Sequence, residues 1–175
     1  KELINKIRKI IFNHIKKIKK IKNKNDNEEN ITKIFNNFHQ YVSLRELNSL
    51  RFNIYKKINL GSTFSEIYYK IAKNYLDDLV GNELAMQKKI NLSIQMPKDK
   101  DSLLDLHSDI YAGESPFQVV VWTPLVDAYD TKSMFFTKPI FNKQMNEKLL
   151  NTNKFTTKEM YNKKKKNFKF LNIKF

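Results

Sequence analysis

The sequence predicts an α+β fold in two regions, a helical region at residues 1–82 and a strand-rich region at residues 83–175. In the first region, apolar residues recur every three or four positions, which is the period of a helix buried on one face. In the second region, "INLSIQM" (90–96) alternates apolar and polar residues, which is the period of a half-buried strand. A length of 175 residues suits one domain that combines both regions.

The expected N-terminal helix carries an apolar stripe with lysine on most other positions. The stripe consists of Ile4, Ile7, Ile11, His14, Ile18 and Ile21. An amphipathic helix of this kind can pack on its own domain, pair with another helix or lie on an anionic membrane. Packing on the domain is the default, and a basic membrane- or RNA-associated module formed by residues 1–24 is an alternative. His14 is expected to be a packed or boundary residue.

Three further helices are expected in the first region. Two of them run from about 30 to 38 and from 43 to 55. The third begins with "TFSE", a capping-box pattern in which Thr63 caps and Glu66 returns the hydrogen bond. Gly81 is placed to end this helix. Its expected core-facing residues are Ile67, Ile71, Leu76 and Leu79.

The second region is expected to contain several strands separated by turns. The strands are 90–96, the segment with His107 and Asp109, 117–126, 134–140 and one that begins at 168–175. Residues 117–126, "FQVVVWTPLV", are apolar on both faces, which predicts a central buried strand. "PKDKDS" (97–102) and "AGESP" (112–116) are expected turns.

Composition narrows the class of protein. Because the chain has no cysteine, disulfides and thiolate metal sites are excluded, and the cytoplasm is the simplest location. A net charge of +15 can mark nucleic-acid binding. Base recognition depends on arginine, however, and Arg8, Arg45 and Arg51 are the only three, so charge alone does not favour a nucleic-acid partner. The sequence lacks the run of ~20 apolar residues that a transmembrane helix needs.

His107 and Asp109 are the strongest candidate metal ligands. Residues i and i+2 of a strand point to the same face, so an imidazole and a carboxylate at these positions can approach one ion. One carboxylate and two imidazoles form the facial triad of non-haem Fe(II) oxygenases. The alternative is a surface histidine near an aspartate, because so short a motif often occurs by chance. The strand-rich context favours the metal site.

The segments "INLSIQMP", "LHSDIYAGESPFQVVVWTPLVD" and "TKSMFF" resemble a family of 2-oxoglutarate- and Fe(II)-dependent oxygenases from bacterial carbohydrate gene clusters, the sporadic carbohydrate-cluster oxygenases. These are distant relatives of phytanoyl-CoA dioxygenase. The resemblance covers about residues 68–136 and keeps the order of the motifs. It implies a double-stranded β-helix (a cupin-like jelly roll) with the helices packed outside. It also implies an enzyme that uses Fe(II) and 2-oxoglutarate to oxidise a carbohydrate, nucleotide-sugar or glycan-related substrate.

The resemblance implies that His107 and Asp109 are two of three iron ligands. In the family, the third ligand is a histidine on a later strand, and a basic residue beyond it binds the distal carboxylate of 2-oxoglutarate. Neither is found before Phe175, so we expect the sequence to be a fragment with an incomplete jelly roll that binds iron poorly. A non-catalytic jelly-roll sugar binder is the alternative if the distal residue is not histidine.

Further residues are candidates for binding the cofactor. Asn91, Ser93 and Gln95 share the polar face of their strand and are expected to contact 2-oxoglutarate or substrate, with an exposed strand face as the alternative. Lys132 and Ser133 stand where a strand end can reach the site, with a solvated lysine as the alternative. The expected partner is a small carbohydrate-type molecule, and the sequence predicts no oligomeric state.

Overall fold

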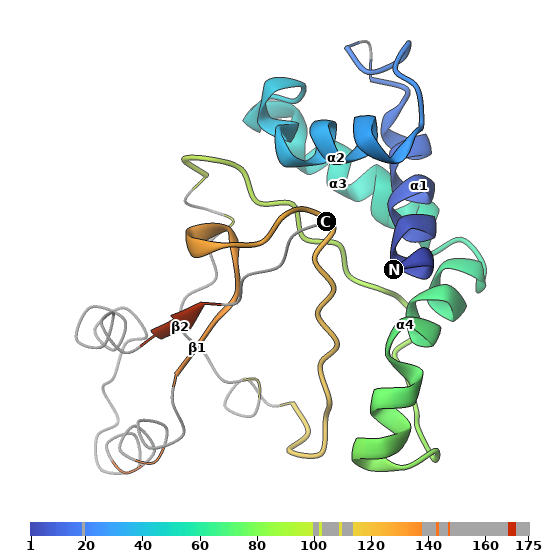
Figure 1. Ribbon diagram of the computed structural model, residues 1–175, viewed down its shortest axis with the longest axis vertical. Coiled ribbons are helices and arrows are strands. Elements are labelled where there is room, and N and C mark those ends of the chain that lie inside the picture. Colours follow the sequence, from blue (N-terminus) through green and yellow to red (C-terminus); the bar gives the residue numbers. More distant parts are fainter. Residues whose placement is uncertain are drawn as a thin grey trace. The chain divides into compact units, whose positions relative to one another are not determined.

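The computed structural model describes residues 1–18, 20–99, 102, 109, 114–137, 143, 147 and 168–170 (Figure 1). The chain divides into two compact units, Lys1–Ser102 and Leu103–Phe175, and each unit is described by itself. The first unit contains four α-helices followed by an extended segment, which therefore belongs with the helices. Within the described part of the chain, every helix is too short or too polar to cross a bilayer.

Helix α1 (Glu2–Ile15) packs its apolar face into the core of the first unit, against α2 (Glu28–Asn36) and the two later helices. The helix is shorter than the apolar stripe, because the chain forms turns after Ile15. Ile21, the last residue of the stripe, lies in these turns and is buried. The expected packing on the domain is confirmed, so this face is not free to lie on a membrane. The buried apolar residues of α1 are Ile7, Ile11, Phe12 and Ile15.

Side-chain caps define where two of the helices begin. The Asn27 side chain accepts a hydrogen bond of 2.9 Å from the backbone N–H of Asn30 at the start of α2. Helix α3 (Leu44–Ile58) begins after Ser43, whose backbone N–H and hydroxyl both donate to the Glu46 carboxylate, at 3.1 Å and 2.7 Å. These bonds hold the pKa of Glu46 below its ordinary value. A short 3₁₀ helix, η1 (Phe38–Gln40), precedes α3.

Helix α4 (Thr63–Val80) begins differently from the sequence prediction. Its cap is Ser62, and no side-chain hydrogen bond caps it, so the capping box expected at Thr63 is wrong. The Ser62 carbonyl instead accepts bonds from the Glu66 N–H at 2.9 Å and the Ser65 hydroxyl at 2.8 Å. Thr63 is therefore the first residue of the helix and not its cap.

The C-terminal end of α4 is set by Gly81, as predicted. Gly81 has a φ of 83°, a left-handed conformation that costs glycine little and ends the helix. Burial is confined to the first turns of α4, where Phe64 and Ile67 are the buried residues. The expected core position of Leu79 is wrong, because this side chain is 75% exposed.

The extended segment 90–96 follows the predicted alternation. Ile90 and Met96 are buried, and the polar side chains between them point to solvent. Met96 joins Val42 and Leu47 in a small apolar cluster of the helical unit. The exposed residues of the segment are Asn91, Ser93 and Gln95. The period-two pattern therefore reports correctly which face packs on the helices.

Regular β structure in the described residues consists of one short pair. Strands β1 (Phe135–Thr137) and β2 (Phe168–Phe170) run antiparallel, with Phe136 opposite Lys169. Each strand falls within a segment that was expected to be extended. The later residues of both segments lie outside the described part of the chain.

The predicted double-stranded β-helix is wrong for the part of the chain that the structure describes. A jelly roll needs about eight strands in two packed sheets, whereas the regular structure here is four α-helices and one three-residue strand pair. The physical reason is that alternation records which face is buried and not which backbone groups pair. Segment 90–96 has the alternation of a strand but is fastened to a helix by side chains.

Residues 117–126 do not form the expected central buried strand. Phe117 is 90% exposed and Val120 is 60% exposed, although most of the segment is extended. Phe117 lies in a turn in which the Gln118 N–H donates to the Ser115 carbonyl at 3.1 Å. An apolar run makes burial favourable, but it does not supply the partner surface that covers the run.

Candidate functional site

Of the two predicted iron ligands, the structure describes Asp109. His107 lies outside the described residues. Asp109 is half-buried, and its carbonyl accepts a hydrogen bond of 3.0 Å from the backbone N–H of Glu114. Within the described ranges, no three side chains of His, Asp or Glu gather as a set of metal ligands. The described residues therefore include one of the two expected ligands and no complete set of metal ligands.

The other two histidines lie in the helical unit, while His107 and Asp109 belong to the second unit. His14 is half-buried on the last turn of α1, which confirms the boundary position expected for it. His39 is exposed in η1.

The three polar residues proposed for cofactor binding on segment 90–96 are all exposed. Asn91 and Ser93 point away from the buried face that Ile90 and Met96 define. The Gln95 side chain has a specific contact, because its Nε2 donates to the Ser102 carbonyl at 3.2 Å. The amide of Gln95 thus connects the end of the extended segment to the turn that follows it.

Lys132 and Ser133 lie at the end of a short 3₁₀ helix, η3 (Asp130–Lys132), in the second unit. The exposed Lys132 side chain places its Nζ 5.1 Å from the centroid of the Tyr129 ring. The Ser133 hydroxyl donates to the Met134 carbonyl at 3.2 Å. Both contacts are local, so they fix the conformation of this loop.

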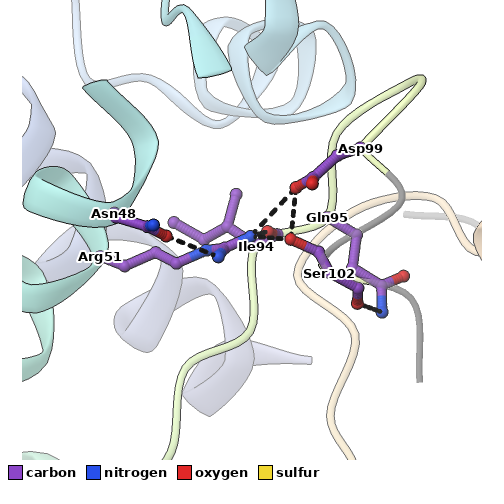
Figure 2. Close-up of polar contacts among 6 residues, drawn as sticks. All are labelled: Asn48, Arg51, Ile94, Gln95, Asp99 and Ser102. Carbon is purple, nitrogen blue, oxygen red and sulfur yellow. Dashed lines mark hydrogen bonds and ion pairs between the residues drawn. The ribbon is translucent and has the colours of Figure 1, made fainter. Parts of the chain in front are cut away.

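Arg51 on α3 makes several polar contacts with side chains and backbone of the helical unit (Figure 2). Its Nε donates to the Ile94 carbonyl at 3.1 Å, and Nη2 donates to the same oxygen. Nη1 donates to Asn48 Oδ1 at 3.1 Å, which orients the guanidinium from within the helix. Nη2 also lies 3.4 Å from Asp99 Oδ2. All three nitrogens of the planar guanidinium group therefore donate hydrogen bonds.

Asp99 and Ser102, which follow segment 90–96 in the sequence, both contact this guanidinium. The Ser102 hydroxyl accepts a bond from Arg51 Nη2 and donates to Asp99 Oδ2. The Arg51–Asp99 ion pair is mostly shielded, since the two side chains are only 25% and 10% exposed. A partly buried, hydrogen-bonded pair of this kind is screened less by salt than a pair at the surface. We call Arg51, Ile94, Asp99 and Ser102 the Arg51 clamp.

A second side chain of α3 holds the other end of the extended segment. Asn59, the residue at the C-terminal cap of α3, accepts a 2.7 Å hydrogen bond from the Ile90 N–H through Oδ1. Its Nδ2 donates to the Ile90 carbonyl at 3.0 Å and to the Tyr55 carbonyl at 2.9 Å. The Asn59 amide thus bonds both backbone groups of Ile90, as a neighbouring strand would do.

The sequence argument did not identify the roles of Arg51 and Asn59. One signal was present, because three arginines among 33 basic residues stand out in a lysine-rich chain. Arginine is favoured over lysine where one group must make several fixed hydrogen bonds. Apart from Asn48, the partners of Arg51 are 43 to 51 positions away, which is beyond the reach of any local pattern.

His14 gives a pH-dependent contribution to the stability of the helical unit. Burial, with the positive charges of Lys57 and Lys17, lowers the pKa of His14 below its ordinary value of 6.5. The unfolded chain then binds the proton more tightly than the folded chain. Stability from this residue is fully present above 6.5 and is lost as pH falls from 6.5 through the lower folded pKa.

We therefore expect the free energy of unfolding to decrease between about pH 7.5 and about pH 5.5, and His14→Gln to reduce that decrease. Urea titrations followed by circular dichroism measure the free energy of unfolding of the wild-type protein and of His14→Gln at each pH. His39→Gln is the matched control, because this histidine is exposed in η1. An unchanged pH dependence in His14→Gln would show that other groups cause the decrease.

Comparison of the chain with family models, curated proteins and solved structures finds no match. The assignment of function therefore depends on the motifs of the chain itself. Of these, the His107-x-Asp109 pair and the segments around it carry the most chemical information.

Proposed function

We propose that the protein is an Fe(II)- and 2-oxoglutarate-dependent oxygenase, with His107 and Asp109 as two of the iron ligands. The observation that carries the proposal is the order of motifs in the sequence. "INLSIQMP" is followed by "HSD", "SPF", "VVVWTPLVD" and "KSM", the order in which they occur in the oxygenases that the sequence resembles. The proposal depends on this order and on the ligand pair, and not on a jelly-roll architecture.

The chemistry of the two side chains supports the proposal. Imidazole and carboxylate are the ligands used by non-haem Fe(II) oxygenases, and they leave positions of the metal open for small molecules. When bound, Fe(II) with 2-oxoglutarate supplies the oxidising power, and the protein provides binding and orientation. His107 and Asp109 would hold the metal. Lys132 and Ser133, in the same unit, are candidates for binding the anionic cosubstrate, and a small carbohydrate-type molecule is the proposed substrate.

The test uses the protein purified without oxygen. We expect saturable binding of one Fe(II) per chain, and succinate formation that requires both Fe(II) and 2-oxoglutarate. His107→Ala and Asp109→Ala should each weaken Fe(II) binding by at least about 100-fold, because loss of a direct ligand exceeds the effect of its supporting contacts. Calorimetric titration and a succinate assay measure the two quantities.

His39→Ala is the control variant, because this exposed histidine of η1 is not part of the proposed site. It should bind Fe(II) as the wild-type protein does. The proposal fails if wild-type protein and the His107→Ala variant bind Fe(II) equally, or if 2-oxoglutarate is not consumed in the presence of bound iron.

A further inference from the structure

The turns that follow α1 carry apolar and basic residues in a three-residue repeat. Backbone hydrogen bonds of 2.9 Å join the Ile18 N–H to the Ile15 carbonyl and the Ile21 N–H to the Ile18 carbonyl. In turns with this bond, residues three positions apart project from the same side. Ile15 and Ile21 are buried, and Ile18 packs against a buried apolar cluster. The same repeat therefore places Lys17 and Lys20, which are both exposed, together on another side.

Lys17 meets a further lysine from another helix. Helix α1 packs against α3 (Figure 1), and the exposed Lys57 lies in the last turn of α3. The positive charge of Lys17 and a close side-chain contact lower the pKa of Lys57. Burial and the charges of Lys57 and Lys17 lower the pKa of His14, so the imidazole lies near the same two groups. We call Lys17, Lys20 and Lys57 the lysine patch.

Acidic residues neutralise little of this charge. The sequence contains no aspartate or glutamate between Glu2 and Asp26. Within the described residues of the helical unit, the ion pairs involve other basic side chains, namely Lys9, Arg51 and Lys73. Hydrogen bonds from Ser43, and then the charge of Lys20, lower the pKa of Glu46, so one carboxylate lies near Lys20. The excess of positive charge is therefore at the end of the patch formed by Lys17 and Lys57.

We propose that the lysine patch binds the phosphate backbone of double-stranded nucleic acid without reading its sequence. This inference is independent of the proposed oxygenase function. Lysine contacts phosphate as a point charge, whereas guanine is read chiefly by bidentate side chains such as arginine. Lys17 and Lys20 are about 6 Å apart along the turns. Each strand of a duplex carries one phosphate per about 3.4 Å of axis, so the two lysines can contact different phosphates, which a single small anion does not provide.

An anionic membrane fits this patch less well than a nucleic acid. Stable attachment to a bilayer combines basic residues with an inserted apolar group or a second anchor. The apolar residues next to the patch lysines are Ile15, Ile18 and Ile21, and all three pack into the helical unit. The patch therefore offers charge without an apolar anchor, and charge is sufficient for binding a phosphate backbone.

The test measures binding of the full chain to a fluorescein-labelled DNA duplex of about 20 base pairs by fluorescence anisotropy. Each lysine–phosphate contact contributes about 0.9 to the slope of log affinity against log salt concentration. Lys17→Gln/Lys57→Gln should therefore reduce this slope by about 2. Between about 50 and about 200 mM NaCl, the wild-type protein should then lose about tenfold more affinity than the variant. A second duplex of unrelated sequence should bind the wild-type protein equally well, within about threefold.

Lys33→Gln/Lys70→Gln is the matched control, because it removes the same charge from two exposed lysines on α2 and α4. It should keep the wild-type slope, and its affinity should stay within about twofold of wild type. Because all four substituted lysines are exposed, both variants should keep the wild-type circular dichroism spectrum.

Three results would overturn the inference. An unchanged slope in Lys17→Gln/Lys57→Gln would mean that these lysines do not contact phosphates. An equal reduction in the control would mean that the net charge of the chain, and not the patch, causes binding. Binding to phosphatidylcholine–phosphatidylserine vesicles that the patch variant loses, without binding of the wild-type protein to the duplex, would assign the patch to a membrane surface.

Discussion

We expect Phe12→Ala to lower the free energy of unfolding of the helical unit by about 3–5 kcal/mol, the usual cost of removing a buried phenylalanine. Phe12 has no exposed surface. Its ring packs against Phe35 of α2 with 6.5 Å between centroids and a tilt of 50°. Tilted aromatic pairs add about 0.5–1.5 kcal/mol to the burial itself. The mutation therefore leaves a cavity where α1 meets α2.

Urea denaturation followed by far-ultraviolet circular dichroism measures this loss, since the helices supply the signal. Phe52→Ala is the control, because it makes the same chemical change at a side chain that is 58% exposed on α3. The control should cost less than about 1 kcal/mol, mainly through the contact between the Phe52 ring and Lys56 Nζ at 4.4 Å. Equal losses in the two variants would contradict the packing of α1 described here.

The second large effect is expected at Arg8, a charged residue that is only 1% exposed. Its Nη2 donates to the Thr32 hydroxyl at 2.7 Å, and its guanidinium carbon lies 5.7 Å from the centroid of the Phe35 ring. Arg8→Ala removes a desolvated cation–π contact, a hydrogen bond and the packing of the long aliphatic stem. We expect a loss of about 2–4 kcal/mol in the free energy of unfolding.

A second substitution separates the stem of Arg8 from its charge. Arg8→Met keeps the aliphatic packing and removes the guanidinium, so we expect it to cost less than half as much as Arg8→Ala. Arg45→Ala on the exposed face of α3 is the control and should change stability by less than about 0.5 kcal/mol. Denaturation of all three variants in urea provides the comparison. A loss in Arg8→Ala no larger than in Arg45→Ala would exclude a stabilising role for the buried guanidinium.

Local patterns predicted most of the helical unit. The helices expected near 30–38 and 43–55 are α2 and α3, displaced by up to three residues at their ends. The Gly81 terminus and the alternation of 90–96 were also correct, because both depend on the conformation or burial of neighbouring residues. The capping box failed at Thr63, since the preceding Ser62 can also cap and the motif does not decide between them.

The β architecture could not be obtained in the same way. Strand pairing requires partners that are distant in sequence, and the apolar segment 117–126 contains no information about which surface covers it. Among the candidate site residues, the sequence alone selects His107 and Asp109, through their spacing and the motifs around them. Gln95 was selected for cofactor binding, and in the structure its amide donates a hydrogen bond to the Ser102 carbonyl.

The sequence by itself determined the approximate places of the four α-helices that the structure describes, the buried face of the extended segment and the chemical nature of the candidate metal ligands. Each of these follows from period, capping residues or side-chain type within a few positions. Only the tertiary structure decided that Arg8 is buried and that Arg51 and Asn59 fasten the segment 90–96 to α3. An arginine on a lysine-rich helix gives no local sign of its partners, because these are brought to it by packing of the core.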